Sequence, residues 1–423
     1  MDLRSGCQYW TQKQGDPPPR APALDRDLAA RVAILGGGIT GALAAHYLTR
    51  AGIDTVLVDR RDLAARSTAA STGLLQYEID KPLVDLSQLV GPAAAARAYL
   101  LGVAALDEFE RLTRALDDDC GFARRPSLFL ANAPGDAEHF RAECRARRGI
   151  GLRVDFLAEP DLRRQFGLAR PGAILSHDAA QVDPVRLASA LIRRATADGL
   201  RPFAGTQIDR YETDGRTVTL TTQAGHRLRA DHVIFATGYE TPEFLKDLPV
   251  KLKSTYALAA RVDREGEAPS EPSVPGGSPE PGRAPAAQRV GLPECLIWET
   301  GTPYFYARAD GPARLIAGGE DDDFADPETR DARIPRKADA LAKKLSRLLP
   351  HVRFEVDCAW AGTFAETADA LPLIGPHPAF PRGLFALGYG GNGITFGLIA
   401  AQLLRDRLLG RDNPDAAIFR FDR

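Results

Sequence analysis

The sequence predicts an α/β protein made of two intimately joined domains, and three observations support this class. First, "RVAILGGGITGALAAHYLTRAGIDTVLVDRR" (31–61) has the pattern of an apolar strand, a glycine turn, a helix and a second strand. Second, "DHVIFATGY" (231–239) is a short, continuous apolar strand of the kind that parallel sheets bury on both faces. Third, a chain of 423 residues is longer than one small core needs.

The predicted elements follow the hydrophobic periods along the chain. Strands are expected at 32–35, 55–59, 125–133, 231–239, 296–298, 304–308, 315–318 and 353–360, and residues 215–229 alternate like a hairpin. Helices are expected at 39–51, 82–116, 136–148, 184–198 and 335–349, and a strand, a glycine turn and a long helix close the chain from Gly383. Asp183 suits the N-cap of the helix that begins at Pro184, because its carboxylate can accept from the first amides.

Composition excludes several classes of function. The formal net charge of −2 gives no reason to expect nucleic acid as a partner. No apolar run approaches the ~20 residues of a transmembrane helix, and the N-terminus lacks the apolar core of a secretory signal. The five cysteines are scattered and the seven histidines form no ligand pattern, so we expect no disulfide framework and no metal. A cytoplasmic enzyme fits this composition.

The glycine turn of the first strand predicts a dinucleotide site. Gly36 permits the tight turn, Gly38 lets the backbone approach a pyrophosphate, and Gly41 lets the helix pack close to the strand. The helix N-terminus at Ile39 and Thr40 then offers amides to the phosphates. Asp59 ends the next strand eighteen residues past Gly41, where a carboxylate can bind the ribose hydroxyls.

The distribution of nucleotide-type signals favours FAD over NAD. An NAD domain of this type is usually one contiguous block, whereas here the signals recur at 36–59, 236–238 and 388–395. A long cofactor that crosses the molecule would need contacts from all three. The four glycines Gly388, Gly390, Gly391 and Gly393 stand before a helix, so they can turn amides and the positive helix end toward the anionic end of a reduced flavin.

At this point the chain resembles the D-amino-acid-oxidase-type (DAO) family of FAD-dependent oxidoreductases, in the branch similar to gamma-glutamylputrescine oxidoreductase and the glycine and sarcosine oxidases. The residues that carry the resemblance are "GGGITG", "RSTAASTGLLQYEID" (66–80), "QVDPVRLASAL" (181–191), "VIFATGY" and "GYGGNGIT". It implies a Rossmann-like, three-layer FAD-binding domain of the GR2 type, interleaved with an α+β substrate domain built on a large, mostly antiparallel sheet.

The resemblance also implies a division of the chain into parts. Residues 1–29 are an extended, proline-containing lead-in, and the FAD-binding domain takes 30–100, 180–250 and 360–423. The substrate domain takes 101–179 and 251–359. Residues 263–288 hold six prolines, four glycines and no Leu, Ile or Phe, which predicts a flexible surface insertion rather than a lid.

The FAD contacts that the resemblance implies form five groups. The pyrophosphate turn and the acidic strand end supply Gly36, Gly38, Ile39, Thr40, Gly41, Asp59 and Arg60. Contacts along the pyrophosphate and the flavin edge come from Ser67, Thr68, Ser71, Thr72, Gly73, Leu74 and Leu75. Ile208 meets the adenine, and Ala236, Thr237 and Gly238 pass the ribityl region. The pyrimidine end of the flavin meets Gly388, Gly390, Gly391, Asn392, Gly393, Ile394 and Thr395, with Gly362 close to the ring.

A carboxylate clamp is the candidate substrate site. Tyr304, Tyr306 and Arg308 stand at i, i+2 and i+4 of a predicted strand, so their side chains share one face. A tyrosine hydroxyl and a guanidinium on one face can hold a carboxylate. For Arg308 a solvated position is an equal alternative, and Trp360 is either a flavin wall or a core residue. No acid–base residue is expected, because hydride transfer to flavin requires mainly orientation of the substrate.

Two departures from the sarcosine-oxidase branch alter the expectation for the flavin. That branch attaches its flavin to a cysteine at the place of Gly362, and Cys358 lies four residues away, so we expect non-covalent FAD. The branch also carries an oxygen-activating lysine near the place of Ile316, where this chain has none. Fast reaction with oxygen is therefore in doubt, with Arg314 or Lys253 as possible substitutes and the electron acceptor either oxygen or unknown.

The leading hypothesis is an FAD-dependent oxidase or dehydrogenase of a small amine or amino acid. The first alternative is an FAD-dependent dehydrogenase of a hydroxy substrate, such as a glycerol phosphate or a 2-hydroxy acid, which needs extra basic residues or a histidine base. The second is a non-catalytic flavoprotein subunit, and the intact glycine turns argue against it.

Overall fold

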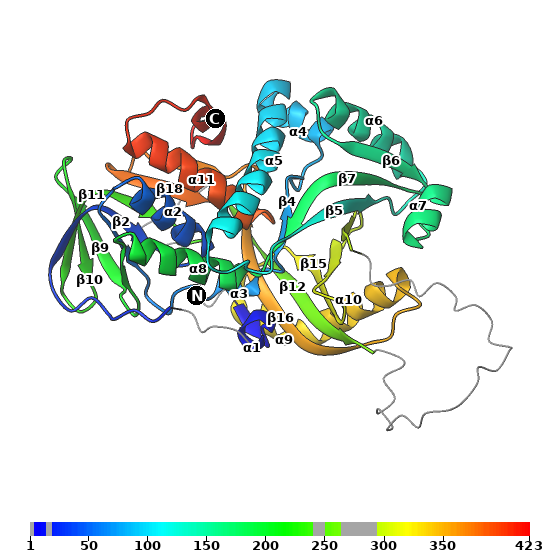
Figure 1. Cartoon of the computed structure of the whole chain (residues 1–423), viewed down its shortest axis with the longest axis horizontal. Coiled ribbons are helices and arrows are strands. Elements are labelled where there is room, and N and C mark those ends of the chain that lie inside the picture. Colours follow the sequence, from blue (N-terminus) through cyan, green and yellow to red (C-terminus); the bar gives the residue numbers. More distant parts are fainter. Residues whose placement is uncertain (1–3, 14–18, 240–249, 264–293) are drawn as a thin grey trace, which may run out of the picture.

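The computed structural model describes residues 4–13, 19–239, 250–263 and 294–423, which are arranged around two sheets (Figure 1). Apart from Asp263, the predicted insertion at 263–288 lies outside the described residues. Within the described ranges, no helix is both long and apolar enough to cross a membrane.

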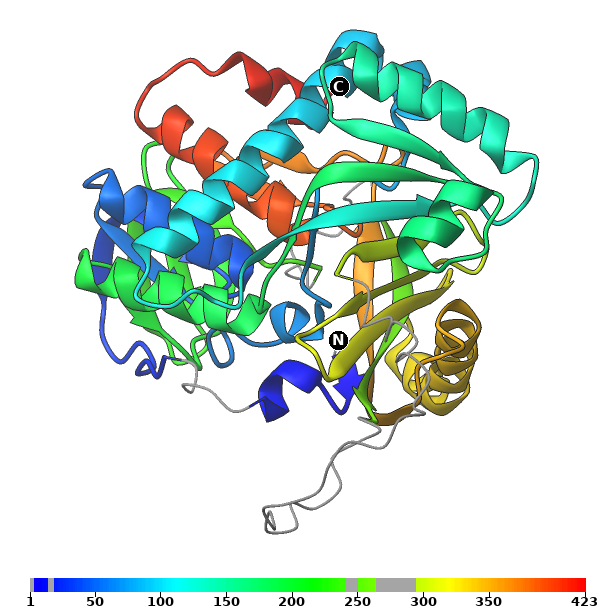
Figure 2. The same ribbon diagram turned by 45° about the vertical axis from the view of Figure 1, so that its right-hand side comes forward.

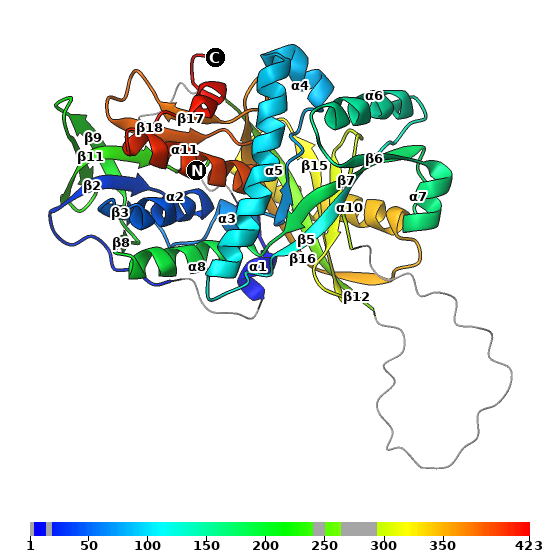
Figure 3. The ribbon, with the colours of Figure 1, turned by 45° about the horizontal axis from the view of Figure 1, so that its top comes forward.

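The smaller sheet is the parallel one. Its order is β17-β18-β11-β2-β3-β8, and every neighbouring pair is parallel except β17 with β18. These strands are Leu373–Pro376, Gly383–Leu387, Arg227–Phe235, Leu28–Leu35, Thr55–Val58 and Arg201–Phe203. Helices α2 (Ile39–Arg50), α8 (Pro184–Ala197) and α11 (Gly393–Leu408) pack side by side on one face (Figure 3). Strands β9 (Ile208–Thr213) and β10 (Val218–Thr222) extend the sheet from β11. Buried Val218 and Leu220 of β10 pack with Ala33 and Val56 of the parallel strands, so β10 contributes the third layer.

The larger sheet is antiparallel except where β13 meets β5. Its order is β1-β16-β12-β15-β14-β13-β5-β7-β4, with β6 beside β7. In that order the strands are Arg4–Gly6, Phe354–Glu366, Lys251–Val262, Arg314–Asp322, Phe305–Ala309, Leu296–Glu299, Ala123–Leu130, Gly172–Gln181, Leu74–Gln76 and, for β6, Val154–Ala158. Helix α10 (Ile334–Leu348) packs against β12, β15 and β16, and α9 (Pro327–Ala332) precedes it (Figure 2). Helices α6 (Asp136–Gly149) and α7 (Glu159–Phe166) pack beside β6 and β7.

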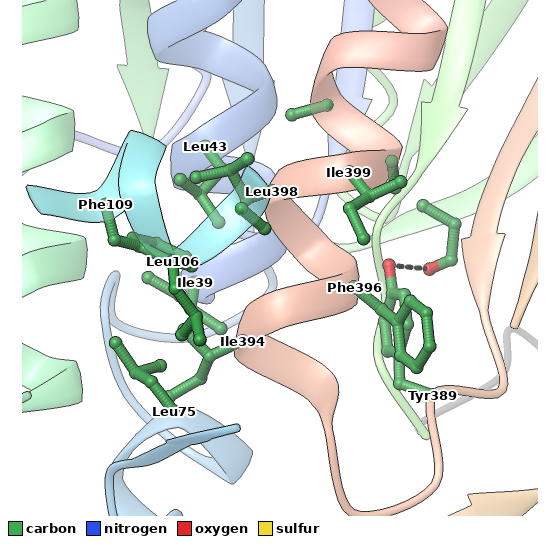
Figure 4. Close-up of a cluster of buried hydrophobic side chains, with 14 of the residues drawn as sticks. Ile39, Leu43, Leu75, Leu106, Phe109, Tyr389, Ile394, Phe396, Leu398 and Ile399 are labelled. Atoms are coloured by element: carbon green, nitrogen blue, oxygen red, sulfur yellow. Dashed lines mark hydrogen bonds between the residues drawn. The ribbon is translucent and has the colours of Figure 1, made fainter. Parts of the chain in front are cut away.

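A long helix crosses the junction of the two sheets. Helix α5 (Pro92–Ala115) follows α4 (Leu83–Val90) and packs against α11 and β7, one element of each half (Figure 3). Its buried Leu106 and Phe109 belong to the same core as Leu43 of α2 and Leu398 of α11 (Figure 4). This shared apolar core holds the two halves of the molecule in one arrangement.

The predicted elements agree with the structure where a local chemical signal defines them. Asp183 caps α8 as expected, since its Oδ1 accepts from the amides of Val185 and Arg186 at 3.1 and 3.0 Å. The predicted helix 82–116 is wrong in one respect, because it breaks at Gly91, whose φ is +85°, before Pro92. Proline disfavours helical backbone at the residue before it, and glycine accepts the positive φ.

The N-terminal lead-in requires a correction. Within the predicted extended stretch 1–29, strand β1 pairs with β16, and helix α1 (Tyr9–Gln12) buries Tyr9 and Trp10 against the larger sheet. Strand β2 also begins at Leu28, before the predicted start. The sequence analysis did not predict these elements, because the apolar side chains before the proline run are too few to give a hydrophobic period. Strand β4 lies inside the predicted FAD-binding range 30–100 but pairs with β7 of the larger sheet.

A buried ion pair within α6 holds the start of α4 through hydrogen bonds. Glu143 accepts from the amides of Leu83 and Val84 at 2.7 and 2.9 Å, so it caps the start of α4. The same carboxylate accepts from Arg147 Nε at 2.6 Å, and both side chains are fully buried. Glu78 lies 3.6 Å from Arg147 Nη1. Removing Glu143 would leave a buried guanidinium without its nearest partner.

We expect Glu143→Ala to destabilise the protein by about 3–5 kcal/mol, because breaking a buried pair leaves an uncompensated charge. The matched control is Glu159→Ala, which breaks an exposed i,i+4 pair with Arg163 (2.9 Å) and should cost less than about 1 kcal/mol. Thermal unfolding followed by circular dichroism measures both. Equal losses in the two variants would contradict the role of Glu143.

Candidate active site

One large cavity of about 1480 Å³ lies between the two sheets. At one end it meets the carboxyl ends of β2 and β3, at Leu35 and Val58. At the other end it meets Trp298, Tyr304 and Tyr306 of the larger sheet. The first end is the place where a parallel α/β sheet binds nucleotides.

The glycine turn after β2 has the geometry that a dinucleotide site requires. Gly36 has φ +109°, and a Cβ there would lie 2.3 Å from the carbonyl oxygen of Ala236. A Cβ on Gly41 would lie 1.8 Å from the Gly36 oxygen, so only glycine allows α2 to pack this close to the turn. Helix α2 begins after Gly38 with no acidic residue in its first turn, and its first amide, Ile39 N, donates to Thr68 Oγ1 at 2.9 Å. The partial positive charge of this helix end is directed at the cavity.

Asp59 is held beside this turn by the backbone. Its Oδ2 accepts from Gly37 N at 2.7 Å and its Oδ1 from Arg61 N at 2.8 Å. Burial raises the pKa of the Asp59 carboxyl, and these two amides oppose that shift. Asp59 lines the cavity with Arg60 and Ile208, and their contacts with FAD stay a prediction.

The segment from Ser67 to Thr72 is held in place by hydrogen-bond donors that the sequence analysis did not identify. Its first residues, Ser67–Ala70, form the short helix α3. Trp360 Nε1 donates to the carbonyl of Ala70 at 2.9 Å, and Trp10 Nε1 donates to that of Ser71 at 2.6 Å. Arg308 Nε donates to the carbonyl of Thr72 at 2.9 Å. Trp360 is 1% exposed and lies outside the cavity lining, so it is a core residue that positions α3 rather than a flavin wall.

The expected role of Arg308 in a substrate clamp is wrong. Its side chain is fully buried, does not line the cavity, and is directed at Thr72, Ala309 and Asp310. The alternating face was predicted correctly for the strand, but Trp10 of helix α1 covers this end of it, with its ring centroid 5.5 Å from the Arg308 guanidinium carbon. A sequence period assigns a face and not the neighbour that the face meets.

The two tyrosines do line the cavity. The rings of Tyr304 and Tyr306 lie 5.7 Å apart at an angle of 47°. Gly318 makes room for Tyr306, since a Cβ there would lie 2.3 Å from the Tyr306 hydroxyl. Burial is the largest cause that raises the pKa of both phenols, so both stay protonated hydrogen-bond donors at neutral pH.

The glycine turn before α11 contacts the segment 76–80. Gly391 N donates to Asp80 Oδ2 at 2.9 Å, and Asn392 Nδ2 donates to the carbonyl of Glu78 at 2.7 Å. Gly390 has φ +57°, and a Cβ there would lie 2.6 Å from Asp80 Oδ2. Asn392 precedes α11 without a side-chain cap bond, so this helix also begins at the cavity. The sequence predicted the turn but not its acidic neighbour.

Most predicted FAD contacts lie in one cavity although they come from distant parts of the chain. The predicted residues that line it are Gly36, Gly38, Ile39, Thr40, Asp59, Arg60, Ser67, Thr68, Ser71, Thr72, Leu74, Ile208, Ala236, Thr237, Gly238, Tyr304, Tyr306, Gly362, Gly390, Gly391, Asn392, Gly393 and Ile394. Those placed outside the lining are Gly41, Gly73, Leu75, Arg308, Gly388 and Thr395. Gly41 and Gly73 instead serve close backbone packing, Gly73 against the Val182 oxygen.

The thiol and the cations considered for flavin chemistry have other partners. Cys358 lies outside the cavity lining, and its Sγ is 2.6 Å from that of Cys7, so the position of Gly362 offers no thiol. Arg314 pairs with Asp357 away from the cavity. Lys253 lines the cavity and pairs with Glu366 at 2.7 Å.

Fold and site together define a flavin-type nucleotide-binding oxidoreductase. The family model described as "DAO: FAD dependent oxidoreductase" matches residues 31–407, and the chain belongs to this family, so FAD is its cofactor. The glycine oxidase of Bacillus licheniformis is 25% identical over 405 residues, which cover 90% of this chain and 93% of that protein.

Two solved structures share the fold. The glycine oxidase of Geobacillus kaustophilus has a TM-score of 0.70 at 21% identity, with 94% of this chain and 99% of that chain covered. The dithionite-reduced L-alpha-glycerophosphate oxidase of Mycoplasma pneumoniae with FAD bound has a TM-score of 0.70 at 14% identity, with 91% and 97% covered. At these identities the similarity shows the fold alone, so the substrate must be argued from this chain's own cavity.

We expect Gly41→Ala to abolish retention of FAD, because the new methyl group would push α2 away from the glycine turn. The matched control is Gly149→Ala, since a Cβ there meets no atom within 4 Å. The measurement is the flavin absorbance per mole of purified protein. Normal flavin content in Gly41→Ala would show that the turn tolerates a shift of the helix.

Proposed function

We propose that this chain oxidises the carbon–nitrogen bond of a small amine or amino acid. Bound FAD supplies the acceptor for the hydride that leaves the carbon beside the substrate nitrogen, and water then hydrolyses the resulting imine. The observation that carries the proposal is the continuity of one cavity from the glycine turn at Gly36 to Tyr304 and Tyr306 at the start of β14. A substrate at Tyr306 would therefore lie at the far end of a cofactor anchored at Asp59.

The residues that line the cavity fit FAD. Asp59 would bind the adenosine ribose, the first amides of α2 the pyrophosphate, and Ile208 would lie beside the adenine. Gly391 and Asn392 at the start of α11 would meet the flavin's pyrimidine end. Non-covalent attachment is supported by the glycine at position 362.

In this proposal the side chains orient the substrate and keep water out. Tyr304 and Tyr306 remain protonated and can donate hydrogen bonds to a substrate or a water that replaces it. Trp298 stacks on Phe129 with ring centroids 3.7 Å apart and closes the apolar side of the cavity. The acid–base demand is small, since the amine has only to arrive neutral.

The cavity offers less to the hydroxy-substrate alternative. A phosphate group would need a cation at the tyrosine end, and Lys253 there is already paired with Glu366. An alcohol would need a base, and His139 is an exposed residue of α6 at the edge of the cavity. The paired Lys253 also supports slow reaction with oxygen, although the electron acceptor and a cytoplasmic location stay predictions.

The experiment is anaerobic addition of an amine and amino-acid panel to the purified yellow protein. Bleaching of the flavin by an amine is expected, and readmission of air then separates an oxidase from a dehydrogenase. A flavin that hydroxy acids or glycerol phosphate reduce, and that no amine reduces, would overturn the proposal.

We expect Tyr306→Phe to lower kcat/KM for the amine by about tenfold, which corresponds to one lost hydrogen bond of about 1.4 kcal/mol, while flavin content stays normal. Arg308→Met should instead lower the flavin content and leave kcat/KM per bound flavin normal. Loss of the guanidinium frees the carbonyl of Thr72, which lies in the segment predicted to contact the flavin edge. Flavin content and steady-state kinetics of both variants measure this. Normal flavin content with lost turnover in Arg308→Met would restore Arg308 as a substrate residue.

A further inference from the structure

The charges at the end of the cavity near Tyr304 and Tyr306 indicate which class of amine the proposed function acts on. We call this part of the cavity the substrate end. This substrate end comprises Asp80, Asp321 and Glu366 with Lys253, beside Tyr304 and Tyr306. Lys253 Nζ lies 2.7 Å from Glu366 Oε2, so these two charges compensate each other. No cation is paired with Asp80 or Asp321 within the part of the chain that the structure describes.

Asp321 is positioned by the register of the larger sheet. Strand β15 ends with Asp322 opposite Ser254 of β12, which brings Asp321 next to Lys253 and Thr255 on the cavity wall. Its Oδ1 is buried and has no hydrogen-bond partner. A buried carboxylate oxygen without a partner costs free energy in the empty cavity, and a positively charged ligand would relieve that cost.

The two uncompensated carboxylates act on one another. Burial raises the pKa of Asp321 to about 6, the charges of Asp80 and Glu366 add to this shift, and a hydrogen bond from Thr255 and the charge of Lys253 oppose it. The same two aspartates raise the pKa of Tyr304 and Tyr306 further after burial, which places all four groups within electrostatic reach. The cavity end therefore carries negative potential that Lys253, already paired with Glu366, cancels only in part.

A carboxylate on the substrate would find no unpaired cation at this end among the described residues, because Lys253 is already paired with Glu366. Arg308 is directed at Thr72 and Asp310 outside the cavity, and Arg147 is fully buried against Glu143. Arg60, Arg61 and Arg66 belong to the loop between β3 and α3, at the nucleotide end. An amino acid bound here would set its carboxylate against Asp80 and Asp321.

We propose that the substrate is an amine with a second positive charge and no carboxylate, such as a diamine or a longer polyamine. One nitrogen is the reacting amine, and the other, still charged, lies against Asp321 and Asp80 with the faces of Tyr304 and Tyr306 beside it. Aromatic faces next to carboxylates form a common site for alkylammonium groups. This inference rests on the proposed function, because it names the substrate class of the same cavity.

The test compares three substrates of one length that differ only in their distal group: pentylamine, 1,5-diaminopentane and 5-aminopentanoate. Each is given anaerobically to the holoenzyme, and kcat/KM for flavin reduction is measured. The expected order is diamine, monoamine, amino acid, with about tenfold or more between neighbours, which is ~1.4 kcal/mol per step. Equal or faster reduction by 5-aminopentanoate than by the diamine overturns the inference and leaves the proposed function intact.

Two variants locate the selectivity. Asp321→Asn and Asp80→Asn should each reduce the ratio of diamine to monoamine kcat/KM by about tenfold, and this ratio is the measured quantity whatever the change for the monoamine itself. The matched control is Asp117→Asn, an exposed aspartate outside the cavity lining. A structural role would not alter the ratio, and an unchanged ratio in both cavity variants overturns the inference. If no amine, diamine or amino acid reduces the flavin, the proposed function itself fails.

Asp321→Asn should also raise the melting temperature of the holoenzyme at pH 8. The folded-state pKa of about 6 lies above the ordinary aspartate value, so the folded protein binds the extra proton and loses stability as pH rises through that interval. Asparagine removes this loss, and the gain should vanish near pH 4, where the carboxyl is protonated. A melting temperature that falls at pH 8 would mean that Asp321 is satisfied within the protein.

Discussion

The arrangement of the cavity depends on the hydrogen bonds that the connecting segment, residues 70–80, makes to both halves of the molecule. This segment leaves α3 beside the nucleotide turn and becomes β4 of the larger sheet. Its carbonyls at Ala70, Ser71 and Thr72 accept from Trp360, Trp10 and Arg308, all on the side of the larger sheet. A peptide carbonyl that accepts a bond from a rigid, buried donor has little freedom to move.

The other end of the connecting segment is bonded to the smaller domain. Gln76 and Glu78 offer their carbonyls to Thr395 and Asn392 at the start of α11, at 3.1 and 2.7 Å. Asp80 accepts from Gly391 in the same turn. The walls of the cavity are thus connected through one short stretch of backbone, and a shift of either sheet would break several of these bonds together. This network explains why the Arg308 guanidinium is fully buried, because it positions the connecting segment and does not bind substrate.

How much could be predicted from the sequence depends on how far apart in the chain the interacting residues lie. The turn at Gly36, the acid at Asp59 and the cap at Asp183 are local chemistry, so their places were predicted correctly. The donors Trp10 and Arg308 act across more than sixty and two hundred residues, and no local pattern indicates which carbonyl they meet. The period placed Arg308 on the correct face, yet the partner of that face is set by the fold.

The acidic substrate end was missed for the same reason. Asp80, Asp321 and Glu366 come from three distant segments, each of which would ordinarily be interpreted as a solvated charge. Whether these carboxylates affect substrate binding depends on which of them pair with cations of the chain, and only the folded structure shows those pairs. Lys253 pairs with Glu366, and no ion pair joins a cation to Asp80 or Asp321 in the part of the chain that the structure describes. Asp321 carries the cost of this arrangement, because its Oδ1 is buried without a partner, and a bound cation would recover part of that cost.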